Sequence, residues 1–343
     1  MARQRIGGLL LSGLMLVTPF SRASAQGVDE LYESAKLEKA LTVYTGAGPA
    51  GAKAMAAAFE RRFPGIVVTA RGDFSNVLDA DIDRQLAAKQ VTTDVVHLQS
   101  LGDFHRWEGT GALLHFKPAG FEQVLSSMKD PDGAWVALNA IPLLYGYNPE
   151  RVREPDVPRS ALDFLKPEFR GKAVSVYPSA DDATLFCLHL IVQKYGWDYM
   201  ARYMANDPYF IVGHRDVAAR LRSGQSWVSF DVSSGQAATL RSLLPENDKT
   251  PVFFVAGAIL KDAPHPNAAK LFLTWSLSRD QQEKEPRRYS PRTDVAPPPG
   301  MPPLTSDRFE TGYGEFLGDA TRIAELRRRF EQYTGPVVNQ ATE

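Results

Sequence analysis

The sequence has little cysteine and little net charge. Its 343 residues include one cysteine, Cys187, which excludes an internal disulfide framework and a cysteine-rich zinc site. Because it lies in an apolar helical stretch, Cys187 is expected to be a small buried core residue. The 39 basic and 40 acidic residues give a net charge of −1, so the sequence carries no field that would gather nucleic acid.

Motifs for metal, phosphate and acyl-transfer chemistry are also missing. The sequence contains no H-E-x-x-H, no G-x-S-x-G and no Walker A loop, and its histidines never fall at i, i+3 or i+4 spacing. Residues 46–51 read G-x-G-x-x-G, but Pro49 removes an amide donor, and Arg71 and Gly72 stand where a dinucleotide site needs an acidic residue. We therefore expect no cofactor, no metal and no catalytic residue. A secreted enzyme built on a two-lobe scaffold is the alternative.

The N-terminal segment has the three parts of a secretory signal peptide. A basic start over residues 1–5 precedes an apolar run over 6–17, and Ala23-Ser24-Ala25 provides a small-x-small cleavage site. The run is too short for a permanent anchor, and no later stretch is long and apolar enough to cross a bilayer. Cleavage after Ala25 removes three arginines and leaves a net charge of −4. The mature protein is expected to be soluble and periplasmic, where ATP and NAD are not readily supplied.

The rest of the chain alternates strand and helix patterns. With 44% hydrophobic and 23% charged residues it has the composition of a globular protein, and its length allows two domains. Buried strands are expected over residues 41–45, 66–70 and 94–98, separated by helices over 49–62 and 76–89. Repeated strand–helix–strand units predict an α/β fold with a mainly parallel sheet and helices on both faces.

A second block in the middle of the chain repeats this pattern. Its expected strands and helices cover residues 172–177, 181–195, 209–212, 217–222 and 227–230. Extended apolar segments at 137–147 and 251–260 flank the block, and helices are expected over 266–277 and 319–333. Two crossings suggest two hinge strands. We predict lobe 1 from residues 26–141 and 253–343, lobe 2 from residues 142–252, and a ligand cleft between the lobes.

Polar residues gather just after the predicted strands, where ligands bind in open α/β sheets. Each residue alone could be a helix cap or a turn residue, but loops from two lobes are more suggestive together. The candidate ligand-binding residues are Thr45, Gly46, Gly48, Arg71, Asp73, Gln99, Ser100, Ser179, Asp181, Asp182, His214, Arg215, Asp231, Ser233 and Arg292.

Charged members of this set suggest two kinds of ligand contact. Arg71, Arg215 and Arg292 are candidate anion clamps, because a guanidinium binds carboxylate or phosphate through paired hydrogen bonds. Their alternative role is that of exposed surface arginines. The four aspartates of the set could instead hold a cationic or hydroxylated part of the solute.

Several ordered segments carry a resemblance to a known family. The chain resembles bacterial extracellular solute-binding proteins of the ferric-iron/thiamine-type group, which have the type II periplasmic-binding fold, and the resemblance covers nearly all of the mature chain. The segments are Leu41–Gly46, Thr93–Val96, Tyr145–Pro149, Ala161–Lys172, Lys261–Leu273 and Ser290–Val295.

The resemblance implies a periplasmic component of an ABC importer, whose two lobes close over a small solute. The implied partners are that solute and a permease in the inner membrane, and the protein is expected to be a monomer. A sensor that docks on a membrane receptor is an alternative.

The sequence departs from the iron-binding members of this group. Where they carry a His, a Glu and an adjacent Tyr pair, this chain has Gly48, Gln99 and the segment 230–233. Fe(III) requires anionic oxygen ligands, which glycine and an amide cannot supply. Thiamine binders use aromatic residues, and Trp227 or Tyr177 could take that role. An anionic or zwitterionic organic solute is the expected ligand.

Overall fold

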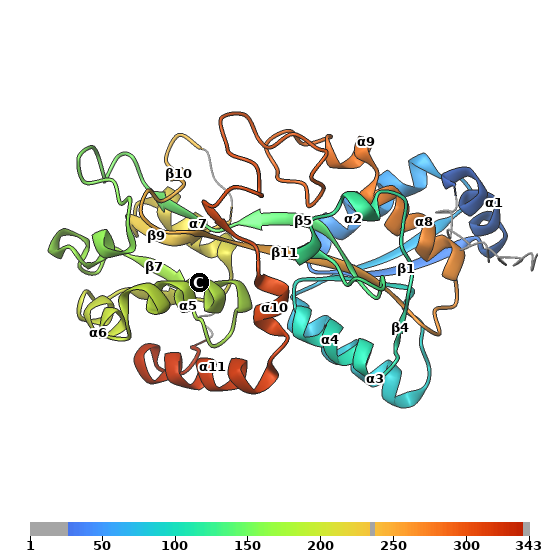
Figure 1. Cartoon of the computed structure of the whole chain (residues 1–343), viewed down its shortest axis with the longest axis horizontal. Coiled ribbons are helices and arrows are strands. Elements are labelled where there is room, and N and C mark those ends of the chain that lie inside the picture. Colours follow the sequence, from blue (N-terminus) through green and yellow to red (C-terminus); the bar gives the residue numbers. More distant parts are fainter. Residues whose placement is uncertain (1–26, 234–236, 339–343) are drawn as a thin grey trace, which may run out of the picture.

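The computed structural model describes residues 27–233 and 237–338, which form two α/β lobes side by side (Figure 1). This arrangement confirms the predicted fold class. The predicted signal peptide and its cleavage site after Ala25 lie outside the described residues. Within the described part, no helix has both the length and the apolar character needed to cross a bilayer.

Lobe 1 is built on a sheet with the strand order β12-β11-β3-β1-β2, in which β11 covers Thr250–Leu260 and β12 covers Phe309–Glu310. Strand β1 alternates half-buried and buried residues, so Leu41, Val43 and Thr45 face the interior. Pro49 occupies the first turn of α2, where its missing N–H costs nothing. The elements before the first crossing are α1 (Val28–Glu38), β1 (Ala40–Thr45), α2 (Gly48–Arg62), β2 (Val67–Gly72), α3 (Ser75–Ala88), β3 (Val95–Leu98), α4 (Leu101–Gly109) and β4 (Leu113–Leu114).

Lobe 2 contains the strand order β10-β6-β9 and the pair β7-β8, which a bridge between Ala173 and Val228 joins. Helix α5 is apolar along most of its length and lies against the crossing strand β11. The elements are β6 (Leu144–Tyr147), β7 (Val174–Val176), α5 (Asp182–Tyr195), α6 (Asp198–Ala205), β8 (Tyr209–Ile211), α7 (His214–Ser223), β9 (Val228–Val232) and β10 (Arg241–Leu243). Short 3-10 helices cover Phe121–Gln123, Ser126–Met128, Ala161–Leu165 and Pro167–Phe169.

Two long strands cross between the lobes. Strands β5 (Val136–Pro142) and β11 (Thr250–Leu260) pair antiparallel, with Val252 opposite Pro142. Strand β11 also runs antiparallel to β3, whereas β1 is parallel to both β2 and β3. The prediction of a mainly parallel sheet is therefore wrong for the crossing region. The sheet is mixed because the chain returns to lobe 1 through β11, opposite in direction to the strands of the strand–helix units.

The C-terminal segment, which the sequence pattern places in lobe 1, packs partly on lobe 2. Helix α8 (Pro266–Leu277) packs on α1, but α11 (Ala320–Thr334) lies against α5 and α6 of lobe 2 (Figure 1). Trp197, directly before α6, contacts Phe330 and Tyr333 of α11 at centroid distances of 4.8 and 5.9 Å. These aromatic contacts attach α11 to lobe 2, although α11 follows lobe 1 elements in the sequence. The remaining elements are α9 (Arg279–Gln282), β12 (Phe309–Glu310) and α10 (Tyr313–Leu317).

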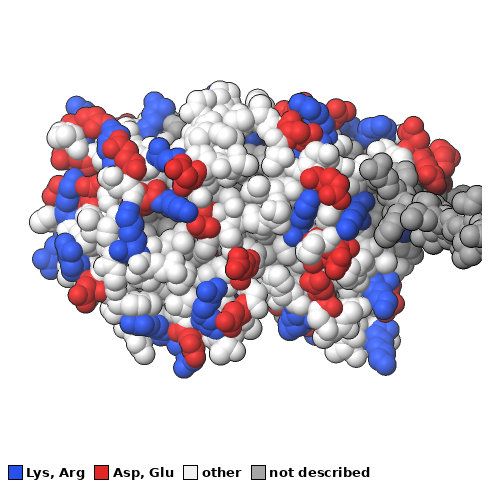
Figure 2. Space-filling model, viewed as in Figure 1, with Lys and Arg blue, Asp and Glu red and all other residues white. Residues whose placement is uncertain are grey.

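The buried core confirms the prediction for the single cysteine. Cys187 is buried in α5, its Sγ lies 3.8 Å from the carbonyl oxygen of Phe230, and burial raises the pKa of its thiol well above its ordinary value. A thiol in this environment stays protonated and packs as a small apolar group. On the face shown in Figure 2, acidic and basic side chains are interspersed over both lobes, and the area between the lobes is mostly uncharged.

Candidate functional site

Loops at the ends of strands in both lobes meet between the lobes. The side-chain amide of Gln99, after β3, donates to Oδ2 of Asp181, before α5, over 3.2 Å. The guanidinium of Arg215, at the start of α7, donates to the carbonyl oxygen of Ala47, after β1, over 2.8 Å. We call these four residues the interlobe contact. It brings together predicted site residues that lie 82 and 168 positions from their partners in the sequence.

The lobe 1 side of this contact is held by a chain of hydrogen bonds. The Ala47 N–H donates to Thr45 Oγ1 over 3.2 Å, and Thr45 Oγ1 lies 3.0 Å from His97 Nδ1. His97 Nε2 lies 3.1 Å from Oδ1 of Asn139 on β5. Burial lowers the pKa of His97 to about 4, against the opposing effect of the Asn139 hydrogen bond. The neutral ring therefore donates to Asn139 and accepts from Thr45, which fixes the loop after β1.

Gly48 lets Arg215 approach this loop. Its φ is +72°, and a Cβ built on it would lie 3.1 Å from Arg215 Nη1. A larger residue would both strain the backbone and push against the guanidinium. Gly46 lies exposed in the same loop, and the Asp73 N–H donates to the Thr45 carbonyl over 3.2 Å. Thr45, Gly46, Gly48 and Asp73 thus lie together next to Ala47.

The lobe 2 side contains a buried ion pair. Asp181 caps α5, with Oδ1 accepting from the Thr184 N–H over 2.8 Å and lying 3.2 Å from His214 Nε2. Burial alone would raise the pKa of Asp181, but the His214 imidazolium and the Thr184 hydrogen bond lower it to about 2. Burial alone would lower the pKa of His214, but Asp181 and Asp231 raise it to about 9. At neutral pH His214 is therefore a cation paired with the Asp181 carboxylate.

His214 also connects this pair to the crossing strand. Its Nδ1 donates to the carbonyl oxygen of Asp231 over 2.9 Å. Its ring stacks on Phe253 of β11, at a centroid distance of 6.0 Å and an interplanar angle of 15°. The cation is thus held on its edges by hydrogen bonds and on one face by an aromatic ring, so its position is fixed before any solute binds.

Two buried hydroxyls flank the contact between Gln99 and Asp181. Ser100 follows Gln99 and Ser179 lies two residues before Asp181, and neither Oγ has a hydrogen-bond partner among the described residues. A buried hydroxyl without a partner is costly, so each such group in a native protein needs an explanation, such as a bound water or ion. One of these hydroxyls belongs to each lobe.

Other predicted site residues lie outside the interlobe contact. Asp231 is fully buried inside lobe 2. Its carboxylate accepts hydrogen bonds from Ser175 Oγ, the Val176 N–H, Thr184 Oγ1 and Ser229 Oγ over 2.8, 2.9, 3.2 and 2.6 Å. The structure therefore uses this carboxylate to join β7, α5 and β9. Ser233 is half-buried at the end of β9.

The remaining predicted charges have partners within the protein. Arg71 pairs with Asp81 on its own lobe at 2.5 Å. Arg292 donates to Asp294 and to the carbonyl of Leu277. Asp182 pairs with Arg327 of α11. The structure thus separates Arg71 and Arg292 from Arg215, which alone of the three arginines joins the interlobe contact.

Three aromatic residues near this contact were not predicted. Phe253 stacks on His214, and the Tyr313 hydroxyl donates to the Gln99 carbonyl over 3.1 Å. Phe74 is exposed before α3, and its Cε1 lies 3.9 Å from a Cβ built on Gly213 of lobe 2. The sequence does show a large aromatic residue, Phe74, directly after the candidate Asp73, and this neighbour could have been included among the candidates. Tyr313 and Phe253 give none, because only the fold brings them to the contact.

The described residues contain no group of three or more His, Cys, Asp or Glu side chains arranged to hold a metal ion. Of the positions at which the sequence is expected to depart from iron-binding members of the group, Gly48 offers no side chain and the Gln99 amide is bonded to Asp181.

Comparisons with known proteins agree with the two-lobe arrangement. The family model described as bacterial extracellular solute-binding protein matches residues 102–289. A probable ABC transporter periplasmic-binding protein, y4fP of Sinorhizobium fredii, is 23% identical over 186 residues, 50% of this chain and 51% of that protein. The Fe(3+)-binding periplasmic protein of Serratia marcescens is 25% identical over 179 residues, 48% of this chain and 53% of that protein. The chain thus aligns with about half the length of each of these curated relatives.

Two solved structures show the same fold over most of the chain. Iron-bound HitA from Pseudomonas aeruginosa has a TM-score of 0.70 at 21% identity and covers 85% of this chain and 99% of its own. AfuA from Actinobacillus pleuropneumoniae, with fructose-6-phosphate bound, has a TM-score of 0.72 at 20% identity and covers 86% of this chain and 98% of its own. At these identities the likeness establishes the fold alone.

Proposed function

The chain belongs to the bacterial extracellular solute-binding protein family, and we propose that it captures a small anionic or zwitterionic organic solute between its lobes for an ABC importer. It acts as a binding protein and not as an enzyme. We place it in the periplasm, exported by the predicted signal peptide and cleaved after Ala25, and we expect a monomer that meets an inner-membrane permease.

One observation carries this proposal. Residues from both lobes converge at the interlobe contact, and Ser100 and Ser179 add a buried, unpartnered hydroxyl from each side. A solute that contacts both lobes stabilises the closed arrangement by its differential affinity for that state. The Arg215 guanidinium and the N-termini of α4, α5 and α7 favour a negatively charged group there.

Iron is the competing ligand, because two of the relatives named above carry or bind it. We propose that this chain does not bind Fe(III) through its own side chains. The positions of Gly48 and Gln99 offer no anionic oxygen, and the Asp181 carboxylate is already paired with His214. Fe(III) added to the protein should produce no tyrosinate charge-transfer band in the visible spectrum.

A thermal-shift screen tests the function. Organic acids, sugar phosphates, amino acids and Fe(III) would each be added to the purified protein. A true ligand at 100 times its Kd should add about 2.7 kcal/mol to the free energy of unfolding. We expect a response to one class of organic anion or zwitterion and none to Fe(III). A response to Fe(III) alone would overturn the proposed ligand class.

A variant localises the response. Replacing both hydroxyls, Ser100→Ala with Ser179→Ala, should abolish the ligand-induced shift while the unliganded protein stays folded. The matched control is Ser223→Ala, which removes an exposed hydroxyl at the end of α7. If the double variant keeps the full shift, the solute binds away from the interlobe contact.

A further inference from the structure

The C-terminal helices form a connection between the lobes besides the two crossing strands. Helix α10 packs on α4 and β11 and also on α5 of lobe 2, and α11 continues along α5 and α6 (Figure 1). We call residues 313–334 the C-terminal strap. Because its two ends are attached to different lobes, separating the lobes must move or stretch it.

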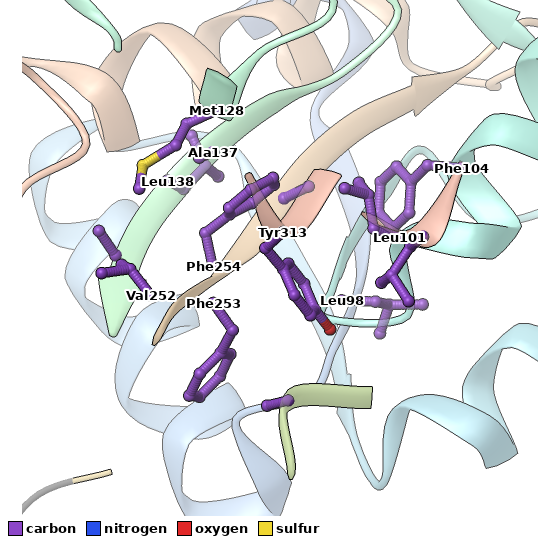
Figure 3. Close-up of a cluster of buried hydrophobic side chains, with 14 of the residues drawn as sticks. Leu98, Leu101, Phe104, Met128, Ala137, Leu138, Val252, Phe253, Phe254 and Tyr313 are labelled. Carbon is purple, nitrogen blue, oxygen red and sulfur yellow. The ribbon is translucent and has the colours of Figure 1, made fainter. Parts of the chain in front are cut away.

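The first end of the strap is anchored in lobe 1. Tyr313 is completely buried, with its ring 5.5 Å from that of Phe254. Its hydroxyl points toward the end of β3 near Leu98, where it donates to the carbonyl oxygen of Gln99 (Figure 3). The carbonyl of the next residue, Gly314, accepts a hydrogen bond from His105 Nε2 of α4 over 3.1 Å. This end is therefore bonded to the residue whose side chain reaches Asp181.

The second end is anchored in lobe 2. Phe316 packs on Phe186 of α5 at a centroid distance of 4.9 Å. The guanidinium of Arg329 lies 3.8 Å from the ring centroid of Trp197, directly before α6. Arg327 forms an ion pair with Asp182, the first residue of α5 and the neighbour of Asp181. This end is therefore bonded next to the lobe 2 member of the same contact.

The strap is thus bonded to Gln99 through Tyr313 and to the neighbour of Asp181 through Arg327, so it contacts the chain at both partners of the Gln99–Asp181 hydrogen bond. From this geometry we propose that the C-terminal strap favours the closed arrangement of the lobes before solute binds, with Tyr313 and Arg327 as positioning residues. If both anchors are intact, the strap reduces the cost of closure that the solute must offset, and so raises apparent affinity. This regulation rests on the proposed two-lobe capture, but its test requires no solute.

Distances between spin labels on the two lobes test the proposal. Lys53→Cys on α2 and Arg202→Cys on α6 provide exposed labelling sites in lobe 1 and lobe 2. The native Cys187 can stay, because its buried thiol resists deprotonation and labelling. Pulsed electron paramagnetic resonance on the mature, solute-free protein should give one dominant, short distance.

Two variants should shift this distribution. Tyr313→Phe removes only the hydroxyl bonded to Gln99, and Arg327→Gln removes the charge paired with Asp182 while its partly exposed side chain keeps folding intact. In each variant the ratio of long to short distances should rise by a factor of about 5, the scale of one net hydrogen bond. The matched controls are Tyr289→Phe, whose hydroxyl also donates to a carbonyl oxygen (Pro302), and Arg328→Gln on the exposed side of α11.

The outcomes separate cleanly. A shift in both variants and in neither control supports the strap. A folded variant pair with the wild-type distribution would overturn it, as would a wild-type distribution already as open as that of the variants. Failure of the solute screen would leave this result unaffected, so the two proposals fail independently.

Discussion

The two sides of the interlobe contact differ in charge. Lobe 1 contributes a backbone carbonyl and an amide, from Ala47 and Gln99, and its nearby histidine, His97, is neutral. Lobe 2 contributes the Arg215 guanidinium and the Asp181 carboxylate paired with the His214 cation. Within the interlobe contact, the charged side chains thus come from lobe 2, and substitutions on the two sides should have different consequences.

The largest difference should appear when a partner is deleted from each side. Asp181→Ala leaves the His214 cation without its carboxylate and removes the cap of α5, so we expect a loss of about 3–5 kcal/mol in the free energy of unfolding. Gln99→Ala removes a neutral donor and should cost about 0.5–1.5 kcal/mol. Urea denaturation measures both. Equal losses would mean that the ion pair does not dominate the contact.

Removing the Arg215 charge from lobe 2 should affect solute binding more than it affects the stability of the protein. Arg215→Ala should weaken solute binding by about 2–5 kcal/mol, the scale for truncating one partner of a buried charge pair. Its free energy of unfolding should change by less than about 0.5 kcal/mol, because the guanidinium is exposed. Titration calorimetry with a solute from the screen measures the affinity. The control is Arg222→Ala at the other end of α7, and equal affinities in both variants would remove Arg215 from the site.

The two histidines should give opposite pH dependences. The pKa of His214 is raised from 6.5 to about 9, so its stabilisation is complete below pH 6.5 and is lost as the pH rises through 9. The pKa of His97 is lowered to about 4, so its stabilisation is complete above pH 6.5 and is lost as the pH falls through 4. Each effect amounts to about 3 kcal/mol.

Unfolding measured across the pH range in two variants separates these effects. His214→Gln should remove the decline above pH 6.5, and His97→Gln should remove the decline between pH 6.5 and 4. If both variants lose the same limb of the curve, the assignment of opposite charge states to the lobes is wrong.

The smallest effect concerns an arginine outside the contact. Arg292 is buried against Asp294 and the Leu277 carbonyl, so Arg292→Ala should destabilise the protein by about 1–3 kcal/mol without changing solute affinity. Thermal unfolding together with calorimetry checks both quantities. A loss of affinity with unchanged stability would restore Arg292 as an anion clamp.

Sequence predicted the strand–helix units and the loops of the contact because these follow local periodicity. Thr45, Gln99, Asp181 and Arg215 were all found as polar residues after strands. The same rule also selected Asp231, because it cannot tell a carboxylate at the interlobe contact from one facing the interior of a lobe. All five residues of β9 are buried, and that burial comes from packing on both faces of the strand.

Long-range packing explains the other differences. The placement of α11 on lobe 2 depends on Trp197, Phe330 and the pair of Asp182 with Arg327, which lie more than a hundred residues apart in sequence. The contribution of Tyr313 has no local signal for the same reason. Sequence pattern reports which face of an element is apolar, but it does not report which distant element covers that face.

The most direct test of the account is a crystal structure of the protein with the solute that the thermal-shift screen identifies. The account predicts one solute molecule between the lobes, within hydrogen-bond distance of Ser100 Oγ and Ser179 Oγ, with its anionic group near Arg215. A solute bound to one lobe only, or one lying away from both hydroxyls, would contradict the claim that the interlobe contact is the binding site.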